Sequence, residues 1–588
     1  MLTQNDYTFG SKLNPESIFS VSPIGVTLAG SVKRYLSNLS HLPNYSEVES
    51  KVSFVSNNVT VEPLETKTVD ENESRSITPV NPEITCFEVD LSQWDSIDEG
   101  VIDAAVDDIT RPLSSNFQYD DSSYQDQESE LNSHCNDFVL ENMKRDDTGR
   151  LSVPLLWNDR VSHLLSSNVK LSKMVLKSNY KRISKDCEKM KLYDEAIKSH
   201  VDAGVLEPID NLSRYMTEHP NVSFIPHMPV YRLQKETSRC RVVLLSNLAE
   251  KTNPSSISHN QAMHSGMNLN HKLSTAIMKL RFNKFLLTFD IVKAFLNISL
   301  RPIDQDKLLI LWIKENKKNG VDMKAYKYKR LPFGLRCSPT LLMLCLYRVL
   351  ILDAVNDSPE LRDMKSRIYD LTYVDNCSIT FESECELIDA YKVMNSIFNP
   401  YQLYLQQFVT NSQMLQRIMD TDLEVDSTPE EVKLLGMQYN RSTDSLATQP
   451  TKLDETADTK RKILSSIASN YDLLQINGPI LNRARLLMHK LQCATDLDWN
   501  SKIPATDSKE WRNICKQTNA SPSLSIRRCI GKHDSKFRLI AFGDASKVMF
   551  GTVLYLQNTK TNQVSFLLAK NRLVTKQLDG KSIPALEL

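Results

Sequence analysis

The sequence has no uninterrupted apolar stretch of about eighteen residues, and its N-terminus lacks a basic start followed by an apolar block. A membrane-spanning helix and a secretory signal are therefore not expected, and no membrane partner is predicted. The eleven cysteines are scattered, and no two of them have the C-x2-C spacing. This argues against a zinc ribbon, a zinc knuckle or a disulfide framework, so the thiols are expected to be reduced inside a cell.

Charge is distributed unevenly along a chain whose net charge is only −1. Residues 61–130 contain nineteen Asp and Glu against three Lys and Arg, a balance of −16. Of the 71 basic and 72 acidic residues in the whole chain, the remaining sequence therefore holds 68 and 53, a balance of +15. A basic body of this kind favours a phosphate-backbone partner. The alternative is charge scattered over a solvated surface.

At 588 residues the chain is too long for a single core. Residues 1–133 are rich in Ser, Asn, Asp and Glu with little periodic apolar pattern, and we expect them to be mostly disordered. From Leu151 to about Tyr439, short apolar segments alternate with polar turns, as in a mixed α/β domain. Residues 455–500 have helical periodicity, and FRLIAFGDAS followed by GTVLYLQN predicts a hairpin that begins a further domain.

One apolar strand carries a single carboxylate at its end. The segment FLLTFDIVKAF (285–295) delivers Asp290 and then turns, which places Phe295 five residues later. In nucleic-acid polymerases a strand Asp of this kind holds metal, and an aromatic ring after the turn collides with a 2′-hydroxyl group and so selects deoxynucleotides. The alternatives are a capping Asp and an aromatic residue of the core.

Two further segments have turn chemistry. In LPFGLRCSPTLL (331–342), Pro332 and Gly334 predict a tight turn whose backbone can approach a ligand, followed by a helix. In LTYVDNCSIT (371–380), two short β-prone runs flank Asp375-Asn376. A hairpin with a carboxylate at its tip suits a two-metal phosphoryl-transfer site whose partner carboxylate comes from another strand. An Asx turn in an ordinary hairpin is the alternative.

The order and spacing of these segments resemble the palm motifs of reverse transcriptases. The strand Asp with its aromatic residue, LPFG-x3-SP, YVDN and then VKLLGMQYN (432–440) follow one another as in that series. Flanking segments such as IPHMPV (225–230), SGMNL (265–269) and the final FGDAS and SIPALEL resemble the Pol polyprotein of BEL/Pao-type retrotransposons. The resemblance extends from about Leu151 to Leu588.

The resemblance implies an α/β (α+β) fold of the right-hand polymerase type, with palm, fingers and thumb, an antiparallel palm sheet and a truncated ribonuclease H-like domain. We expect four regions: an acidic, mostly disordered segment (1–133), fingers and palm (134–440), a helical thumb or connection (441–530), and a partial ribonuclease H-like domain (531–588).

The resemblance also implies metal ligands. Asp290, Asp375 and the carbonyl of Ile291 would hold two Mg²⁺ or Mn²⁺ ions in the polymerase site. Asp544 and Glu587 would be the first two acidic residues of a ribonuclease H-like site, which also uses two metal ions.

The implied substrate contacts come from several segments. Arg241 would reach the nucleotide triphosphate with its fork of donors. Phe295 would select the sugar, and Phe333 and Gly334 would line the nucleotide pocket. The hairpin that grips the primer end would contain Lys433 and Gly436.

Three features depart from the family pattern. The family has Tyr-Val-Asp-Asp where this chain ends the motif in Asn376, which is similar in shape but neutral. Gln407 stands where the family has a Lys that helps to protonate the pyrophosphate, and loss of a general acid typically lowers a rate by about 10²–10⁴-fold. The sequence stops at Leu588, before the remaining acidic residues of a ribonuclease H fold. These features predict a fragment or a decayed copy.

The predicted function is RNA-directed DNA synthesis by the reverse-transcriptase region of an LTR-retrotransposon polyprotein, and Asn376 and Gln407 leave open whether the activity is retained. The partners would be an RNA or DNA template with its primer, and deoxynucleotides. The predicted location is intracellular, in a cytoplasmic virus-like particle with access to the nucleus. One alternative is an inactive relic that binds nucleic acid. Another is an aspartic peptidase, because Asp147-Thr148-Gly149 spells that family's triplet, although charged neighbours place it in a polar turn.

Overall fold

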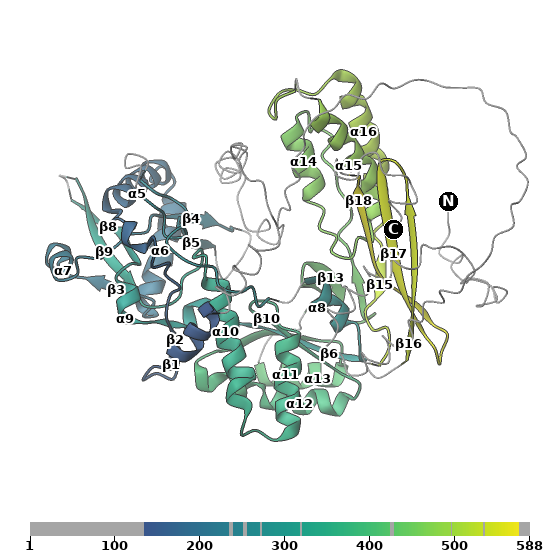
Figure 1. Ribbon diagram of the computed structural model, residues 1–588, viewed down its shortest axis with the longest axis horizontal. Helices are drawn as coiled ribbons and strands as arrows, with labels where there is room; N and C mark the ends of the chain where they lie inside the picture. Colours follow the sequence, from purple (N-terminus) through teal and green to yellow (C-terminus); the bar gives the residue numbers. More distant parts are fainter. Residues whose placement is uncertain are drawn as a thin grey trace, which may run out of the picture. The chain divides into compact units, whose positions relative to one another are not determined.

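The computed structural model of the protein describes residues 134–574 except 234–238, 251–255, 271–272, 318–319, 424–428, 495–496 and 533–535. Residues 1–133, for which we expected disorder, lie outside the described residues. Glu587, the proposed second ribonuclease H ligand, also lies outside them. The described chain forms two compact units, whose elements Figure 1 labels. The first contains residues 134–272 and 284–428, and the second contains residues 273–283 and 429–574. Within these described residues, no helix has both the length and the apolar character needed to cross a membrane.

The first unit is built around a three-stranded antiparallel sheet in the order β10-β6-β11. The central strand β6 (Phe285–Ile291) is apolar and buried over most of its length, and a strand pairs with it on each side. β10 (Asn376–Phe381) pairs with it so that Asn376 lies opposite Asp290. β11 (Leu405–Thr410) pairs on the other side, with an irregularity after its second residue. The expected antiparallel palm sheet is therefore present.

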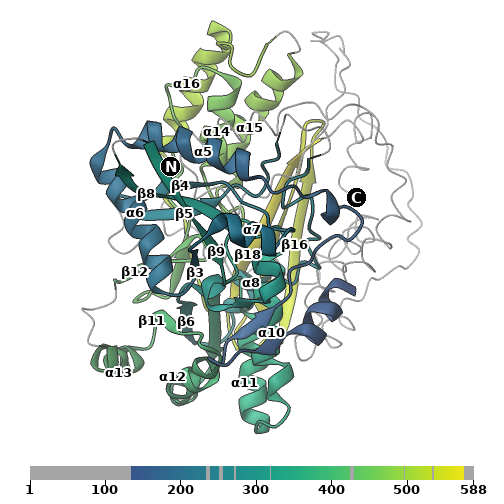
Figure 2. The same ribbon diagram turned by 90° about the vertical axis from the view of Figure 1, so that its left-hand side faces the viewer.

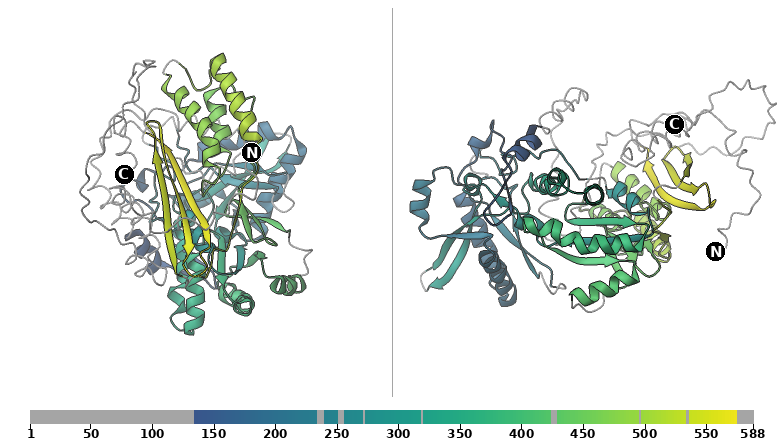
Figure 3. Two further views of the ribbon diagram at one scale, coloured as in Figure 1. Left: turned by 90° about the vertical axis from the view of Figure 1, so that its right-hand side faces the viewer. Right: turned by 90° about the horizontal axis from the view of Figure 1, so that it is seen from below.

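Four helices pack together below this sheet in Figure 1 and contribute to one hydrophobic core with it. They are α10 (Ser338–Leu350), α11 (Pro359–Asp370), α12 (Glu384–Phe398) and α13 (Gln413–Leu423). α10 is apolar on most of its surface and is accordingly buried over most of its length. α11 contacts β10, and α12 contacts both β6 and β10 (Figures 2 and 3). Across this contact, the rings of Phe289 and Phe398 meet edge to face with their centroids 5.9 Å apart.

The rest of the first unit consists of small sheets and helices. The strands are β1 (Lys144–Arg145), β2 (Leu151–Val153), β3 (Leu206–Ile209), β4 (His227–Tyr231), β5 (Cys240–Leu244), β7 (Ser299–Leu300), β8 (Leu309–Lys317) and β9 (Gly320–Tyr328). They form the sheets β1-β2-β7, β3-β9-β8 and β4-β5. The helices are α5 (Val169–Ile183), α6 (Cys187–Asp202), α7 (Leu212–Glu218) and α9 (Pro302–Gln305).

A buried aromatic cluster joins three of these elements. Tyr193 of α6 packs against Trp312 of β8 with ring centroids 4.5 Å apart, and its hydroxyl lies 2.5 Å from Nδ1 of His227 on β4. Burial lowers the pKa of His227 to about 4, so this imidazole is neutral at physiological pH. The cluster fixes β4, and with it the β4-β5 hairpin, against the helices and the β8-β9 hairpin.

The second unit combines helices with two sheets. Its elements are α8 (Leu273–Leu280), β12 (Glu431–Leu434), β13 (Met437–Asn440), β14 (Ser445–Ala447), α14 (Lys460–Ala468), α15 (Gly478–Cys493), α16 (Ala505–Asn519), β15 (Ser525–Arg527), β16 (Phe537–Ala545), β17 (Met549–Asn558) and β18 (Val564–Leu573). β12-β13-β14-β15 form one antiparallel sheet, and β16-β17-β18 form another, drawn in yellow in Figure 3. Helices α14 to α16 enclose a core around Trp511, which is completely buried.

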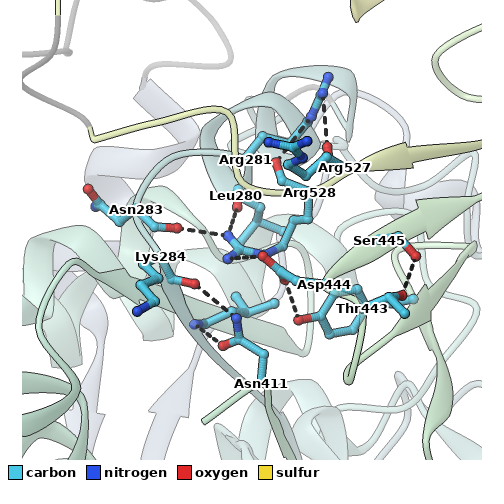
Figure 4. A network of polar contacts seen from close by, with 12 residues as sticks. Leu280, Arg281, Asn283, Lys284, Asn411, Thr443, Asp444, Ser445, Arg527 and Arg528 are labelled. Atoms are coloured by element: carbon cyan, nitrogen blue, oxygen red, sulfur yellow. Dashed lines mark hydrogen bonds and ion pairs between the residues drawn. The ribbon is translucent and has the colours of Figure 1, made fainter. Parts of the chain in front are cut away.

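Two buried arginines connect distant segments of the second unit (Figure 4). The guanidinium of Arg528 forms two bonds to the carboxylate of Asp444, at 2.6 and 2.9 Å, and donates to the carbonyls of Leu280 and Asn283. Arg281 in turn donates to the carbonyls of Arg527, Arg528 and Leu567. Each arginine therefore satisfies backbone carbonyls of the segment that carries the other.

The unit boundaries differ from the expected domain boundaries at two places. The hairpin β12-β13, expected to belong with the palm, extends through β14 to β15 and so lies in the second unit. Residues 273–283 were also expected in the first domain but belong to the second unit. The amide of Ile530 donates to the carbonyl of Arg281, and the amide of Asn283 donates to the carbonyl of Gly531. Both differences arise from pairings between segments far apart in the sequence.

Candidate functional site

The two candidate metal ligands of the first unit lie at the ends of adjacent strands. Asp290 is the sixth residue of β6, and Asn376, its partner in the register, is the first residue of β10, directly after Asp375. The amide N–H of Ile291 donates to the carbonyl of Asp375 at 3.2 Å, which ties the two strand ends together. Tyr373 and Asn376 pair across the turn, and Val374 within it has a φ of +57°. The hairpin predicted around Asp375 is therefore formed.

The two carboxylates influence each other electrostatically. Burial and the negative charge of Asp290 raise the pKa of Asp375 to about 6, against an opposing effect of Arg241. Burial also raises the pKa of Asp290, although a hydrogen bond from Gln406 Nε2 to its Oδ2 (3.1 Å) acts in the other direction. Two partly buried carboxylates that repel each other form a site where a cation would be stabilised.

The donor set fits Mg²⁺ or Mn²⁺ better than a metal that prefers nitrogen or sulfur. Two carboxylates and the nearby carbonyl of Ile291 are hard oxygen donors, and Mg²⁺ commonly binds one or two carboxylates together with substrate phosphates. Among the residues that the structure describes, no group of three or more His, Cys, Asp or Glu side chains is arranged for a metal. The site would therefore depend on phosphate oxygens of a substrate for its remaining ligands.

The third strand brings a residue to this site that the sequence did not reveal. Gln406 of β11 lies opposite Asp290 and hydrogen-bonds to it. Gln407, the predicted departure from the family, follows at a bulge with a φ of +53°, and its side chain is exposed. Of these two neighbouring glutamines, Gln406 is therefore the one that hydrogen-bonds to a candidate metal ligand.

The β4-β5 hairpin brings a cation near Asp375. Arg241 is a partly exposed residue of β5, and its guanidinium interacts electrostatically with Asp375. Burial and the neighbouring Arg232 lower the pKa of Arg241 from its ordinary value, while Asp375 opposes this shift. A cation in this position could neutralise a bound anion beside the two carboxylates.

Two aromatic residues meet where the chain leaves β6. Phe295 lies in a short 3-10 helix (Ala294–Asn297) and is buried, whereas Phe333 is 49% exposed. Their ring centroids are 4.5 Å apart. The structure thus brings together the predicted sugar-selecting residue and one predicted pocket residue.

The LPFG turn approaches β5 closely enough to require glycine. Gly334 has a φ of +94°, and a Cβ atom there would lie 3.1 Å from the carbonyl oxygen of Leu244. Asn260 holds the turn, because its Nδ2 donates to the carbonyl of Gly334 and its Oδ1 accepts from the amide of Arg336. Asn260 was not among the predicted site residues, since nothing in its local sequence distinguishes it.

The remaining predicted residues lie in the second unit. Lys433 is exposed on β12 opposite Gln438, and Leu435 and Gly436 form the turn with φ values of +48° and +86°. Positive φ at both positions is typical of a type I′ hairpin. Tyr471 fills the space beside Gly436, and its hydroxyl donates to the carbonyl of Leu435 at 3.0 Å. The predicted hairpin is formed, and its tip is fixed by this tyrosine.

Asp544 is near the end of β16, opposite Gly551 of β17, and its side chain is exposed. The hairpin predicted from the two apolar segments is confirmed by this pairing, and β18 extends it to three strands. The role of Asp544 as a metal ligand stays a prediction.

Divalent-metal affinity should increase as the pH rises through about 6. A protonated carboxyl group does not ligate a cation, and the pKa of Asp375 is raised to about 6. Titration of the full chain with Mn²⁺, followed by the electron paramagnetic resonance signal of the free ion, should show weak binding near pH 5 and tighter binding near pH 7.5. Equal affinity at both pH values would mean that Asp375 does not ligate the ion.

Asp375→Asn provides the control for this titration. A carboxyl group whose pKa is raised on folding stabilises the fold at low pH, and this contribution is lost as the pH rises from its unfolded pKa through about 6. The substitution should therefore raise the Tm of the metal-free protein at neutral pH while it weakens Mn²⁺ binding.

Two parts of the chain match models of known families. Residues 233–439 match the reverse transcriptase (RNA-dependent DNA polymerase) family, and residues 459–588 match the Pao retrotransposon-like RNaseH-like domain. The first match contains the residues gathered around Asp290 and Asp375. The second begins just before α14, so it includes helices that we expected to form a separate thumb or connection. Together the matches confirm the resemblance to a BEL/Pao-type retrotransposon Pol.

Solved structures of foamy viral protease-reverse transcriptase are also similar to the chain. One is a complex of the dRH form with double-stranded DNA (15% identity, 68% of this chain, 57% of that chain, TM-score 0.44). A complex with an RNA/DNA hybrid has 16% identity and a TM-score of 0.41 and covers 66% of this chain and 43% of that one. Another complex with double-stranded DNA has 14% identity and a TM-score of 0.42, and the match covers 68% of this chain and 69% of that chain. The chain thus spans about half of the first two proteins. No curated protein matches it.

Proposed function

We propose that this protein catalyses RNA-directed DNA synthesis for a retrotransposon. In its sequence, a region that matches reverse transcriptases precedes a region that matches the Pao retrotransposon-like RNaseH-like domain. The observation that carries the proposal is the register between β6 and β10, which sets Asp290 and Asp375 at adjacent strand ends. The raised pKa of Asp375 indicates that their charges repel, as expected of a pair that a cation would bridge.

The proposed reaction is nucleotidyl transfer. The 3′-hydroxyl oxygen of the primer forms a bond to the α-phosphorus of a deoxynucleotide, and the bond to pyrophosphate breaks. One proton leaves the hydroxyl group and one is taken up by the pyrophosphate. Asp290, Asp375 and the carbonyl of Ile291 would hold two Mg²⁺ or Mn²⁺ ions. Such ions stabilise negative charge on the attacking and leaving oxygens.

The surrounding residues would orient the nucleotide. Arg241 would bind the triphosphate, because a guanidinium offers several donors in a fixed plane. Phe295, held against Phe333, would exclude a 2′-hydroxyl group from its side of the pocket. Gly334 would let the backbone approach the nucleotide, and Lys433 and Gly436 would belong to the hairpin that holds the primer end.

Asn376 supports a second candidate function, that of an inactive nucleic-acid-binding relic. Its Nδ2 donates to Oδ1 of Asp375 at 3.3 Å, so the neutral amide occupies an oxygen that would otherwise be free for a metal. It also lacks the negative charge that the family has at this position. Both effects weaken metal binding without disturbing the hairpin, and Gln407 lacks the proton that a Lys would supply to the leaving group.

The triplet Asp147-Thr148-Gly149 has the setting of a structural turn. Asp147 is exposed, and the neighbouring Asp146 accepts hydrogen bonds at Oδ1 from the amides of Thr148 and Arg150. An aspartic peptidase needs its carboxylate enclosed by apolar strands, so the peptidase alternative gains no support here.

A ribonuclease H-like activity would use Asp544 together with Glu587. The proposed partners are an RNA or DNA template with its primer, and deoxynucleotides, and the proposed location is a cytoplasmic virus-like particle with access to the nucleus. These assignments rest on the two family matches.

Primer extension tests the proposal. The purified full chain, with Mg²⁺ or Mn²⁺, a primer–template and deoxynucleotides, should extend the primer slowly. Asp290→Asn should abolish extension and leave primer–template affinity within a few-fold, because it removes a metal ligand from a strand end without changing its shape. Asp389→Asn, an exposed residue of α12, is the matched control and should leave extension unchanged. Extension that persists in Asp290→Asn would contradict the assignment, and its absence in all three proteins would favour the relic.

A further inference from the structure

The turn that contains Asp147-Thr148-Gly149 is organised by the residue before this triplet. Oδ1 of Asp146 accepts hydrogen bonds from the amides of Thr148 (2.9 Å) and Arg150 (3.0 Å) and from the hydroxyl of Thr148 (2.6 Å). An Asp side chain often fixes a turn by accepting from backbone amides a few residues later. One oxygen of the carboxylate therefore holds the turn, and Oδ2 is left for contacts outside it.

Oδ2 of Asp146 contacts two residues that are distant in the sequence. It accepts from the hydroxyl of the buried Ser299 at 2.6 Å, and Nη1 of Arg330, which also donates to that hydroxyl, lies 3.7 Å away. Burial acts to raise the pKa of Asp146, but hydrogen bonds from Ser299, Thr148 and Arg150 outweigh it, so the pKa lies below its ordinary value. The carboxylate is therefore charged at neutral pH, where it pairs with the guanidinium of Arg330.

The two residues that Oδ2 contacts each stand beside an aromatic residue of the candidate site. β7 begins one residue after the 3-10 helix that contains Phe295, and the LPFG turn with Phe333 follows Arg330 directly. Residues 298–300 and 329–331 run antiparallel and are joined by backbone hydrogen bonds of 3.0 and 2.9 Å. The contact between the two rings, whose centroids are 4.5 Å apart, therefore depends on how these short segments are held together.

The turn is itself anchored to the chain just after α12. Gly149 has a φ of +89°, and a Cβ atom there would lie 2.9 Å from the carbonyl oxygen of Pro400. The guanidinium of Arg145 donates to the same carbonyl and lies 4.4 Å from the centre of the Tyr401 ring. The glycine of the triplet thus allows the turn to approach Pro400, which gives Asp146 a fixed position in the first unit.

We propose that Asp146 is a positioning residue for sugar selection. Through its two contacts it holds together the segments that carry Phe295 and Phe333, and so keeps the pocket closed to a ribonucleotide. The proposal rests on the proposed function, in which Phe295 excludes a 2′-hydroxyl group. Asp146 touches neither ring and acts only through the pairing of the two segments. A displacement of about 1 Å in a site can change a rate by about 10²-fold, so the pairing has a large effect to exert.

Nucleotide selection by the full chain tests the proposal. Single-nucleotide extension of a primer–template is measured with dGTP and with GTP, and discrimination is the ratio of the two kcat/KM values. Asp146→Ala and Ser299→Ala should each lower this ratio by about 10–10²-fold, chiefly because GTP is incorporated faster. Ser299→Ala leaves the hydrogen bonds within the turn intact, so it tests the link to β7 by itself.

Hydrogen exchange provides a second measurement that needs neither primer nor nucleotide. The amides of Leu300 and Leu331 should exchange faster in both variants, because they form the bonds that pair the two segments. Ser299→Thr keeps the hydroxyl group and suits a strand, so it should retain the natural discrimination and exchange. Asp147→Ala removes an exposed carboxylate from the same turn and, as the matched control, should change neither.

Three results would overturn the positioning role alone. Faster exchange with unchanged discrimination would show that the pairing does not govern sugar selection. Equal losses of dGTP and GTP incorporation would assign Asp146 to folding, and unchanged exchange in both variants would show that its carboxylate does not hold the segments together. A natural chain that incorporates neither nucleotide would instead refute the proposed function and sugar selection with it, while the exchange of the two amides would still decide whether Asp146 joins the segments.

Discussion

The double substitution Asn376→Asp with Gln407→Lys should raise primer extension by on the order of 10²-fold or more. The first change removes an amide that hydrogen-bonds to Asp375 and adds a negative charge beside the candidate metal pair. The second places a proton donor at an exposed bulge, where Lys meets the same backbone constraint as Gln. Both changes act on the chemical step, so single-turnover extension rates at saturating primer–template are the appropriate measurement.

Gln406→Lys is the sharpest comparison for this experiment. It adds the same positive charge one residue earlier, where the side chain contacts Asp290 instead of solvent. A cation there would compete with metal and should reduce extension. Equal gains from Gln406→Lys and Gln407→Lys would show that the two side chains do not differ in their contact with Asp290. Strong synthesis by the natural sequence would mean that Asn376 is tolerated, and no gain in the double variant would place the limiting defect elsewhere.

Asp444→Ala should destabilise the second unit by about 3–5 kcal/mol, because it leaves the guanidinium of Arg528 buried without its carboxylate. The hydroxyl of Tyr439 would also lose its acceptor. Hydrogen exchange of the amides in β13, β14 and β15 should report the change directly, since these strands meet around the pair.

Two other substitutions separate the contributions. Asp444 has a φ of +50°, a conformation that Asn adopts more readily than Ala, so Asp444→Asn tests the loss of charge with little added backbone strain. Asp458→Ala removes a surface ion pair with Lys462 in the same unit and should leave hydrogen exchange in these strands nearly unchanged, because water screens such pairs. If Asp444→Ala were as mild as Asp458→Ala, the buried pair would not hold the sheet together.

Local patterns were sufficient to predict the core of the candidate site. An apolar strand ending in Asp290 and a β-prone pair flanking Asp375 each have a signature within about ten residues, and their order defined the family resemblance. The hairpin with Gly436 was predictable for the same reason. These features depend on neighbours in the sequence.

Other features of the structure depend on residues that are close in space but distant in the sequence. They are the contacts of Gln406 and Asn260 and the Arg528–Asp444 pair. Gln406 lies opposite Asp290 because of the register between β11 and β6, and the local sequence does not reveal which residues two distant strands pair. Asn260 acts on a turn 74 residues away, and Asp444 and Arg528 are 84 residues apart. The assignment of residues 273–283 to the second unit was missed because its bonding partners follow much later in the chain.

The bond between Arg528 and the carbonyl of Leu280 spans 248 residues, which has a consequence for synthesis on the ribosome. At typical translation rates, roughly ten to fifty seconds separate the emergence of α8 from that of its partner. During that interval the first unit can form its core, while α8 presents side chains such as Met278 without Leu554 and Leu567, which cover it in the finished protein. The nascent chain would thus expose an apolar helix that lies, in the sequence, between the two segments of the first unit. Chaperone binding to residues 273–280, ending once the C-terminal strands emerge, would protect this helix during synthesis.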